Sequence, residues 1–254
     1  MNKEELLTKW LEEEKIAHIH GWDFSHIDGK YVEEKDLPWD YGEIILHYLN
    51  HTMKLLDIDT GGAEFLLSLN HPYENTSATE NYPPNIELCK EQLLPLGVEF
   101  KVADAYYDEL PFDDQTFDIV INRHGSFNAK EIWRILKKNG IFITQQVGAE
   151  NNREFVELLF DDVPPAPFPK QYLKPIQKSF EAIGFTTLQA DEVHLPVKFL
   201  DVGALVWYAH VIPWEFPDFS VQKCVSNLYL AQSILEEKGA IEASIHRFIL
   251  VVQK

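Results

Sequence analysis

Residues 55–64, LLDIDTGGAE, are the stretch that decides the fold. An apolar run ends at Asp57 and passes directly into a turn that contains Gly61 and Gly62, and helix-forming residues follow. Glycine allows a tight turn and a close approach of the backbone to a ligand. A second short strand ends in Glu80, and an acid about 20 residues after such a turn is typical of α/β folds that hold a ribose. The stretch therefore predicts an adenosine-binding α/β fold.

The segment around this turn alternates between strand and helix patterns. Residues 117–122, FDIVIN, form a continuous apolar run, as buried parallel strands do. The helix that follows is expected to stop at Asn139-Gly140. Strands that alternate with helices indicate a parallel, doubly wound sheet. The predicted strands are 53–58, 75–80, 98–102, 117–122 and 141–146, and the predicted helices are 63–69, 83–94 and 129–138.

Two further regions flank this alternation. Upstream, apolar residues recur at helical spacing, so we interpret residues 1–52 as an N-terminal helical cap. Residues 53–254 are predicted to form the α/β domain, with an apolar and aromatic insertion at about 197–220. The remaining predicted helices are 3–19, 40–51, 172–183 and 221–238, and the remaining predicted strands are 185–195 and 245–252.

The net charge of the 254-residue chain is −19. Nucleic-acid binding needs a surface of Lys and Arg, so this charge disfavours DNA or RNA and favours a small molecule or another protein as partner. The two cysteines, Cys89 and Cys224, are far apart, which predicts a reducing compartment. The sequence shows neither a signal-peptide pattern nor an apolar run of ~20 residues. We therefore expect a cytoplasmic protein that does not enter a membrane.

In order and spacing, residues 53–147 resemble a class I S-adenosylmethionine-dependent methyltransferase of a bacterial, type 11-like subgroup. In that family the first strand ends in an acid and leads into a loop with three alternating glycines. The resemblance implies that this loop contacts the methionyl part and the ribose of S-adenosylmethionine, the implied cofactor. The corresponding residues are Asp57 for the acid and Asp59, Gly61, Gly62 and Ala63 for the loop.

Four further positions correspond to cofactor contacts of the family. Glu80 takes the place of the acid that accepts hydrogen bonds from both ribose hydroxyls. Asp104 corresponds to the acceptor of the adenine amino group, and the backbone N–H of Ala105 to the donor that meets the ring. Asn122, at the end of the fourth strand, is the remaining predicted contact. The resemblance also implies a Rossmann-like sheet of seven strands in the order 3-2-1-4-5-7-6, in which only the last strand is antiparallel.

Two loop positions depart from the family pattern. Asp59 replaces the first glycine and brings bulk and negative charge near the expected carboxylate of the cofactor, where repulsion at low dielectric weakens binding. Ala63 replaces the third glycine and adds one methyl group at the expected start of a helix. Two hypotheses remain open: an active methyltransferase, or a catalytically impaired methyltransferase-fold protein that serves in binding or interaction. A nicotinamide-dependent dehydrogenase needs G-x-G-x-x-G, which residues 59–64 do not supply.

The exit from the fourth strand, INRHGSF at residues 121–127, lacks the Asn/Asp-Pro-Pro-Tyr/Phe signature of amino-group methylation on nucleobases. Methyl transfer needs in-line positioning and a base that takes the proton of the acceptor. His124 lies beside the expected methyl group and is the candidate base; packing or a loop hydrogen bond is the alternative. The sequence leaves the acceptor atom open, so we predict transfer to an oxygen, nitrogen or carbon of a small molecule.

Several histidines invite a metal interpretation. His47 and His51 are one helical turn apart, and His18, His20 and His26 lie in one predicted loop. Neither set has a carboxylate partner in a recognised ligand pattern such as HExxH. We therefore predict surface or capping histidines and no metal site.

Overall fold

The computed structural model describes residues 1–19, 23–33, 36–107 and 109–254. The chain divides into two compact units. Unit 1 contains Met1–Asp36, Gly148–Lys170 and His194–His246, and unit 2 contains Leu37–Val147, Gln171–Val193 and Arg247–Lys254. The strands β7 (Thr186–Phe199) and β8 (Ile241–Gln253) contribute residues to both units. The boundary that we expect between residues 52 and 53 stays a prediction of domain organisation.

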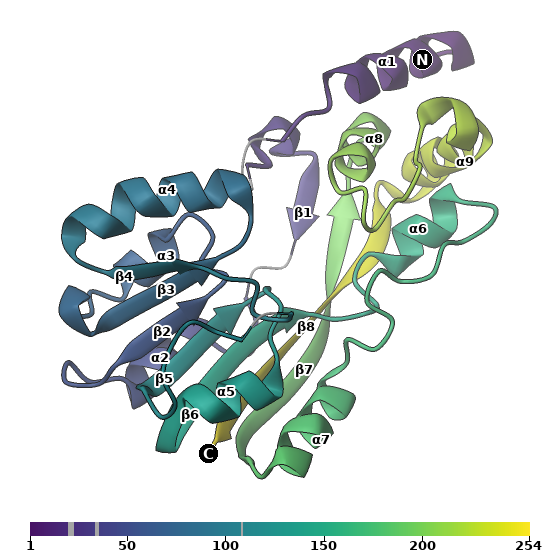
Figure 1. Ribbon diagram of the computed structural model, residues 1–254. Coiled ribbons are helices and arrows are strands. Elements are labelled where there is room, and N and C mark those ends of the chain that lie inside the picture. The colour runs from purple at the N-terminus through teal and green to yellow at the C-terminus, as the bar shows by residue number, and fades with distance from the viewer. Residues whose placement is uncertain (20–22, 34–35, 108) are drawn as a thin grey trace. The chain divides into compact units, whose positions relative to one another are not determined.

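Unit 2 is built on a mostly parallel sheet (Figure 1). Its other strands are β2 (Leu55–Ile58), β3 (Thr76–Glu80), β4 (Glu99–Val102), β5 (Phe117–Arg123) and β6 (Leu136–Val147). The strand order is β7-β8-β6-β5-β2-β3-β4, and β8 runs antiparallel beside β6. This order confirms the predicted 3-2-1-4-5-7-6, because the last strand of the chain lies between β6 and β7 and not at an outer edge.

The predicted number of seven strands is wrong. The sheet has eight strands, because β1 (Tyr31–Glu33) pairs antiparallel with residues 197–199 of β7 in unit 1. The last strand is therefore not the only antiparallel one. A strand of three residues has too few alternating positions to be distinguished from a loop in the sequence.

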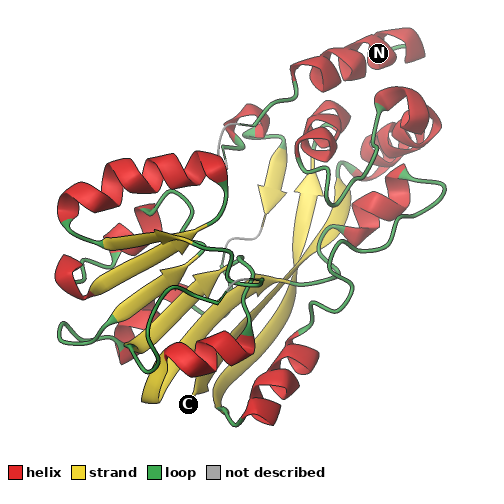
Figure 2. Cartoon of the chain, viewed as in Figure 1, coloured by secondary structure: helices red, strands yellow, loops and turns green. Residues whose placement is uncertain are grey.

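Side chains of unit 2 alternate between the two faces of the sheet, and helices cover both faces (Figure 2). Leu55 and Ile119 pack in one core with α2, α3 and α4, whereas the next residues along their strands, Leu56 and Val120, pack in the other with α5 and α7. Burial on both faces explains why the sequences of β2 and β5 are largely apolar. The helices are α2 (Tyr41–Tyr48), α3 (Glu64–Ser68), α4 (Pro83–Leu93), α5 (Ala129–Ile135) and α7 (Leu173–Ile183).

The connection from α5 to β6 is shorter than predicted. The sequence predicts a helix over 129–138, but α5 ends at Ile135 and β6 begins at Leu136. The Thr116 N–H donates to the Ile135 carbonyl at 2.8 Å, and Leu136 pairs with Phe117 of β5. The chain therefore joins the sheet before the Asn139-Gly140 stop signal is reached.

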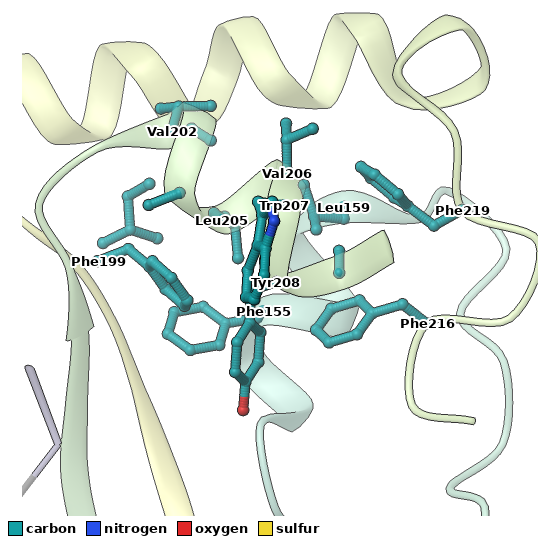
Figure 3. Close-up of a cluster of buried hydrophobic side chains, with 14 of the residues drawn as sticks. Phe155, Leu159, Phe199, Val202, Leu205, Val206, Trp207, Tyr208, Phe216 and Phe219 are labelled. Carbon is teal, nitrogen blue, oxygen red and sulfur yellow. The ribbon is translucent and has the colours of Figure 1, made fainter. Parts of the chain in front are cut away.

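Unit 1 is packed around α8 (Val202–Val211), a helix in which nine of ten residues are buried. Figure 3 shows Leu205, Val206 and Trp207 of this helix among the aromatic rings of Phe155 and Phe216. The segment predicted as an aromatic insertion thus supplies core side chains. The other helices of the unit are α1 (Lys3–Ile16), α6 (Arg153–Leu159), which was not predicted, and α9 (Val221–Lys238). No described helix is long and apolar enough to cross a membrane.

Phe180 of α7 tests the packing of unit 2. It is fully buried, and its ring stacks on Phe142 of β6 at 5.4 Å between ring centroids. Phe180→Ala leaves a cavity between helix and sheet, so we expect a loss of about 3–5 kcal/mol in the free energy of unfolding, measured in urea. The control Phe168→Ala removes a ring that is 59% exposed and should change stability by less than about 0.5 kcal/mol. Equal losses in the two variants would contradict this assignment of the core.

Candidate cofactor site

The turn after β2 enters left-handed backbone at three alternating positions. Asp59, Gly61 and Ala63 have φ angles of 54°, 67° and 71°. Glycine enters this region freely and aspartate tolerates it, whereas Ala63 pays about 1–2 kcal/mol. Ala63 is not the first helical residue, as predicted, but the N-cap of α3, so its methyl group lies in the turn. A β-carbon at Gly62 would meet only the Glu64 carboxylate, which is the end of an exposed side chain that can turn away.

The Asp57 side chain stabilises the turn after β2 by a hydrogen bond. Its side chain is buried in β2 and accepts a hydrogen bond from the Thr60 hydroxyl at 2.7 Å. Burial, the largest cause, and the charges of Asp59 and Glu80 together raise the pKa of the Asp57 carboxyl to about 7, against the lowering effect of the Thr60 hydrogen bond. The observed contact of Asp57 is therefore with the loop, and contact with a cofactor stays a prediction.

Glu80, at the end of β3, joins this turn to the next one. Its Oε2 accepts from the Gly61 N–H at 2.8 Å, and its Oε1 accepts from the N–H groups of Asn81 and Tyr82 at 2.8 and 2.9 Å. A longer contact of 3.4 Å comes from the Asn85 side chain. A carboxylate offers about four acceptor sites. A ribose hydroxyl would therefore have to take the place of the weak Asn85 contact or of one of the amides.

Asp59 connects the turn after β2 to the turn after β5. Its Oδ2 accepts from the Ser126 N–H at 3.0 Å, and Gly125 leaves the room, since a β-carbon there would lie 2.5 Å from Asp59 Cβ. Its Oδ1 is buried without a hydrogen-bond partner among the described residues. Burial, the largest cause, and the charges of Glu80 and Asp104 together raise the pKa of the Asp59 carboxyl to about 7, against the lowering effect of the Ser126 hydrogen bond. The side chain thus carries one unused acceptor.

Asp104 and Ala105 lie directly beyond β4, where the sequence predicts the adenine contacts. The Asp104 Oδ1 accepts from the N–H groups of Tyr106 and Tyr107 at 2.9 and 3.3 Å, which closes a tight turn. Ala105 is fully buried under this turn. The two predicted residues are thus adjacent at the same strand ends as Asp57 and Glu80, but their contact with a cofactor stays a prediction.

Asn122 belongs to a buried hydrogen-bond network that the sequence analysis missed. Its side chain donates to the Ile58 carbonyl at 3.1 Å and accepts from Thr144 and Gln146 at 3.0 and 2.6 Å. Its carbonyl accepts from the Tyr41 hydroxyl at 3.0 Å. The Asn122 side chain therefore ties β5 to β2 and β6. Three consecutive polar residues near the end of β6, Thr144, Gln145 and Gln146, are the signal from which this network was predictable.

His124 is held by Gln145 and Trp39. Its backbone N–H donates to the Gln145 carbonyl at 2.9 Å, and its ring Nε2 lies 3.3 Å from the Gln145 Nε2. The Trp39 indole N–H donates to the Gln145 Oε1 at 2.9 Å, and an indole can only donate. The Gln145 Nε2 therefore donates to His124, which places the ring proton on Nδ1.

The surroundings of His124 disfavour its charged form. Although His124 is exposed to solvent as a whole residue, burial of its imidazole among protein atoms, and then the charges of Arg247 and Arg123, lower the pKa of the ring. A general base works best when its pKa lies near the working pH. The lowered pKa makes the His124 imidazole a weaker base than a free imidazole, and its role as the catalytic base stays a prediction.

The histidines considered for metal binding have other contacts. His26 lies 2.7 Å from a Glu13 oxygen and stacks on Trp207. His47 packs edge-on against Tyr48, and His51 stacks on His71. None of these is part of a group of three metal-ligating side chains in the described part of the chain, and His20 lies outside the described residues.

The site as a whole is rich in acceptors. Asp57, Asp59, Glu80 and Asp104 follow or end three neighbouring strands, at the edge where open α/β sheets bind ligands. An adenosyl cofactor presents ribose hydroxyls and an ammonium group, which are donors, and S-adenosylmethionine adds a sulfonium cation. The unused Asp59 Oδ1 is an acceptor for such a group. The residues present therefore fit this cofactor class.

The raised pKa of Asp59 gives a testable pH dependence of stability. The folded protein holds a proton that the unfolded chain releases near pH 3.8, so the free energy of unfolding falls as the pH rises from about 4 to about 7. Asp59→Asn keeps an acceptor for Ser126 but cannot ionise. We expect it to gain on the order of 2 kcal/mol over the natural protein between pH 4 and pH 8. Parallel pH profiles in urea unfolding would show that Asp59 is not the buried acid described.

Comparisons with known proteins agree with this geometry. Residues 56–144 match the family model described as a methyltransferase domain. The phthiotriol/phenolphthiotriol dimycocerosates methyltransferase of Mycobacterium tuberculosis is 37% identical over 90 residues, which are 32% of either chain. The protein of the same name from Mycobacterium leprae is 41% identical over 66 residues, 26% of this chain and 23% of its own. The match thus spans about a third or less of these relatives.

Solved structures share the fold over most of the chain. A protein from Bacillus halodurans C-125 that is assigned to the methyltransferases aligns with a TM-score of 0.58 at 18% identity, covering 85% of this chain and 98% of its own. The [4+2]-cyclase SpnF aligns with a TM-score of 0.53 at 18% identity, covering 98% and 93%. Residues 56–144 are therefore similar to a methyltransferase domain, and the chain shares its fold with a solved protein that is assigned to the methyltransferases.

Proposed function

We propose that this protein transfers the methyl group of S-adenosylmethionine to an oxygen, nitrogen or carbon atom of a small molecule. The observation that carries the proposal is the Glu80 carboxylate, which holds the Gly61 amide of the turn after β2. Through this contact the loop and the end of β3 form one acceptor-lined surface, at the strand ends where this fold class binds ligands. The match of residues 56–144 to the model of a methyltransferase domain supports the same function.

Each predicted residue has a role in this proposal. When bound, S-adenosylmethionine supplies an electrophilic methyl group on a sulfonium ion. Glu80 accepts from the ribose hydroxyls, and Asp104 with the Ala105 N–H holds the adenine. The backbone at Gly61 and Gly62 lies against the methionyl part of the cofactor. Asp57, Ala63 and Asn122 shape the loop and the strand ends around it.

We propose that His124 orients the molecule that accepts the methyl group. Its Nε2 accepts from Gln145, so the Nδ1–H is the group that it offers to an acceptor atom. The lowered pKa keeps the ring neutral at physiological pH, which suits hydrogen-bond donation better than proton removal. The chain of hydrogen bonds from Trp39 to Gln145 and from Gln145 to His124 fixes the plane of the imidazole ring. In-line methyl transfer depends on such positioning.

The acceptor is proposed to be a small molecule in the cytoplasm. The net charge of −19 disfavours nucleic acid, and no described helix is suited to cross a membrane. The second candidate function is that of a binding or interaction protein that has the methyltransferase fold but does not catalyse methyl transfer. It is retained because Asp59 and Ala63 replace two loop glycines. The fold does not decide between them, since the cyclase SpnF shares it.

Titration of the purified full chain with S-adenosylhomocysteine in a calorimeter tests the proposal. We expect saturable binding at one site per chain, followed by turnover of S-adenosylmethionine when acceptor candidates are supplied. Binding without turnover for any acceptor tested would favour the second function. Absence of binding would reject methyl transfer.

Glu80→Ala should weaken S-adenosylhomocysteine binding more than Asp57→Asn, because Glu80 is placed to contact the ribose and also holds the loop. Each polar group left without a partner costs about 1–3 kcal/mol. A control is Glu99→Ala on β4, whose carboxylate accepts from the Ser77 hydroxyl at the opposite end of the sheet. Calorimetry that shows the same affinity for Glu80→Ala and Glu99→Ala would reject this placement of the ribose.

Asp59→Gly should tighten S-adenosylmethionine binding if the carboxylate opposes that of the cofactor, since the change removes charge and bulk and leaves a residue suited to the left-handed φ of 54°. The comparison of S-adenosylmethionine affinity in Asp59→Gly and Asp59→Asn separates the two contributions, because asparagine removes only the charge. Unchanged binding in both variants would show that the carboxylate points away from the cofactor, and weaker binding would show that it makes a favourable contact; either result would reject the suspected repulsion.

A further inference from the structure

Arg123 is the last residue of β5 and lies directly before His124. The residue is exposed, and within the described ranges its guanidinium has neither a hydrogen bond nor an ion pair. Arg134, by contrast, is held by ion pairs with Glu131 and Asp114. The donors of Arg123 are therefore available to a ligand.

The Arg123 side chain lies on the face of the sheet that α2 and α3 cover. Side chains alternate along a strand, and Ile121, two residues before Arg123, packs in the core with these helices. The Arg123 Cζ lies 5.3 Å from the centroid of the Phe65 ring. Phe65 is the second residue of α3, which begins directly after the turn at residues 59–63. The guanidinium thus lies beside the segment into which the turn leads.

The Phe65 ring restricts the position of this guanidinium. A cation over an aromatic face is attracted to the ring, which limits the movement of the long side chain. Arginine carries five N–H donors and no acceptor. Contact with one ring leaves donors for another group, and a carboxylate is the group that matches them best.

The charge of Arg123 acts on residues on both sides of it. Burial is the largest cause of the pKa shifts of the Asp57 carboxyl and of the His124 imidazole, and the Arg123 charge lowers the pKa of both. Arg247 also lowers the pKa of His124, but it lies on β8, which β6 and β5 separate from β2. Arg123 is therefore the better placed of the two arginines to act at the turn after β2.

The charged side chains assigned to the cofactor so far are carboxylates, namely Asp57, Asp59, Glu80 and Asp104. S-adenosylmethionine carries a carboxylate of its own on the methionyl part. Like charges repel strongly where the dielectric constant is low. A cation beside the turn would remove this conflict, and Arg123 is such a cation.

We propose that the Arg123 guanidinium binds the carboxylate of the methionyl part of the cofactor and so offsets the negative charge that Asp59 brings to the turn. The inference rests on the proposed function, which places the methionyl part against Gly61 and Gly62. Arginine suits this role, because its planar fork forms two parallel hydrogen bonds to one carboxylate.

The test is calorimetry of the full chain with two ligands that differ only in this group, S-adenosylhomocysteine and its decarboxylated analogue. Arg123→Gln should weaken S-adenosylhomocysteine binding at least about tenfold and change the affinity for the analogue less than about twofold, because only the first ligand loses a charge-assisted contact. Arg123→Lys keeps the charge but not the fork, so its loss for S-adenosylhomocysteine should be smaller. Arg123 is exposed, so both variants should fold, which circular dichroism verifies.

Lys130→Gln is the matched control. Lys130 is exposed and belongs to α5, which packs on the opposite face of the sheet, and the change removes the same charge from the chain. It should leave both affinities unchanged. Equal losses for the two ligands in Arg123→Gln, no loss for either, or the same loss in Lys130→Gln would each overturn the inference and leave the proposed function standing. Absence of S-adenosylhomocysteine binding by the natural protein would reject both.

Discussion

The hydrogen bond from the Gly61 amide to the Glu80 carboxylate is the contact on which the cofactor site depends. It joins the turn after β2 to the end of β3, while the second oxygen of Glu80 holds the amides of Asn81 and Tyr82. Hydrogen bonds to an ionised carboxylate are shorter and stronger than neutral ones. One side chain therefore fixes two turns, and with them the left-handed residues on which ligand approach depends.

The same site brings several carboxylates close together, and their negative charges lower the stability of the folded protein. Burial raises the pKa of both Asp57 and Asp59 to about 7, so the folded state resists placing full charges there. Functional sites often carry such perturbed groups, because a bound ligand or a reaction uses them. Under the proposed function, a cofactor that carries ammonium and sulfonium charges compensates part of this cost. Hydrogen bonds from Asn122 to Ile58 and from Ser126 to Asp59 hold the surrounding strands and turns in place.

The strand order and most helices of unit 2 could be predicted from the sequence, because apolar periodicity and glycine turns are local signals. The prediction missed β1 and α6, which have three and seven residues and carry few periodic positions. Ala63 was read as helical, since nothing in the sequence shows that tertiary contacts hold it in a left-handed turn.

The candidate site was predictable to a similar degree. The positions of Asp57, Glu80 and Asp104 at strand ends follow from spacing alone. The tautomer of His124 depends on its contact with Gln145 and, through Gln145, on Trp39, residues that lie far apart in the sequence. Long-range contacts of this kind leave no local pattern, so only the structure reveals them.

The most direct test of the central claim is a crystal structure of the protein with S-adenosylhomocysteine. The account predicts both ribose hydroxyls within hydrogen-bond distance of Glu80, the adenine beside Asp104 and Ala105, and the Gly61 amide still bound to Glu80. A ligand bound elsewhere on the protein, or a Glu80 that keeps all its backbone amides and makes no contact with the ribose, would contradict it.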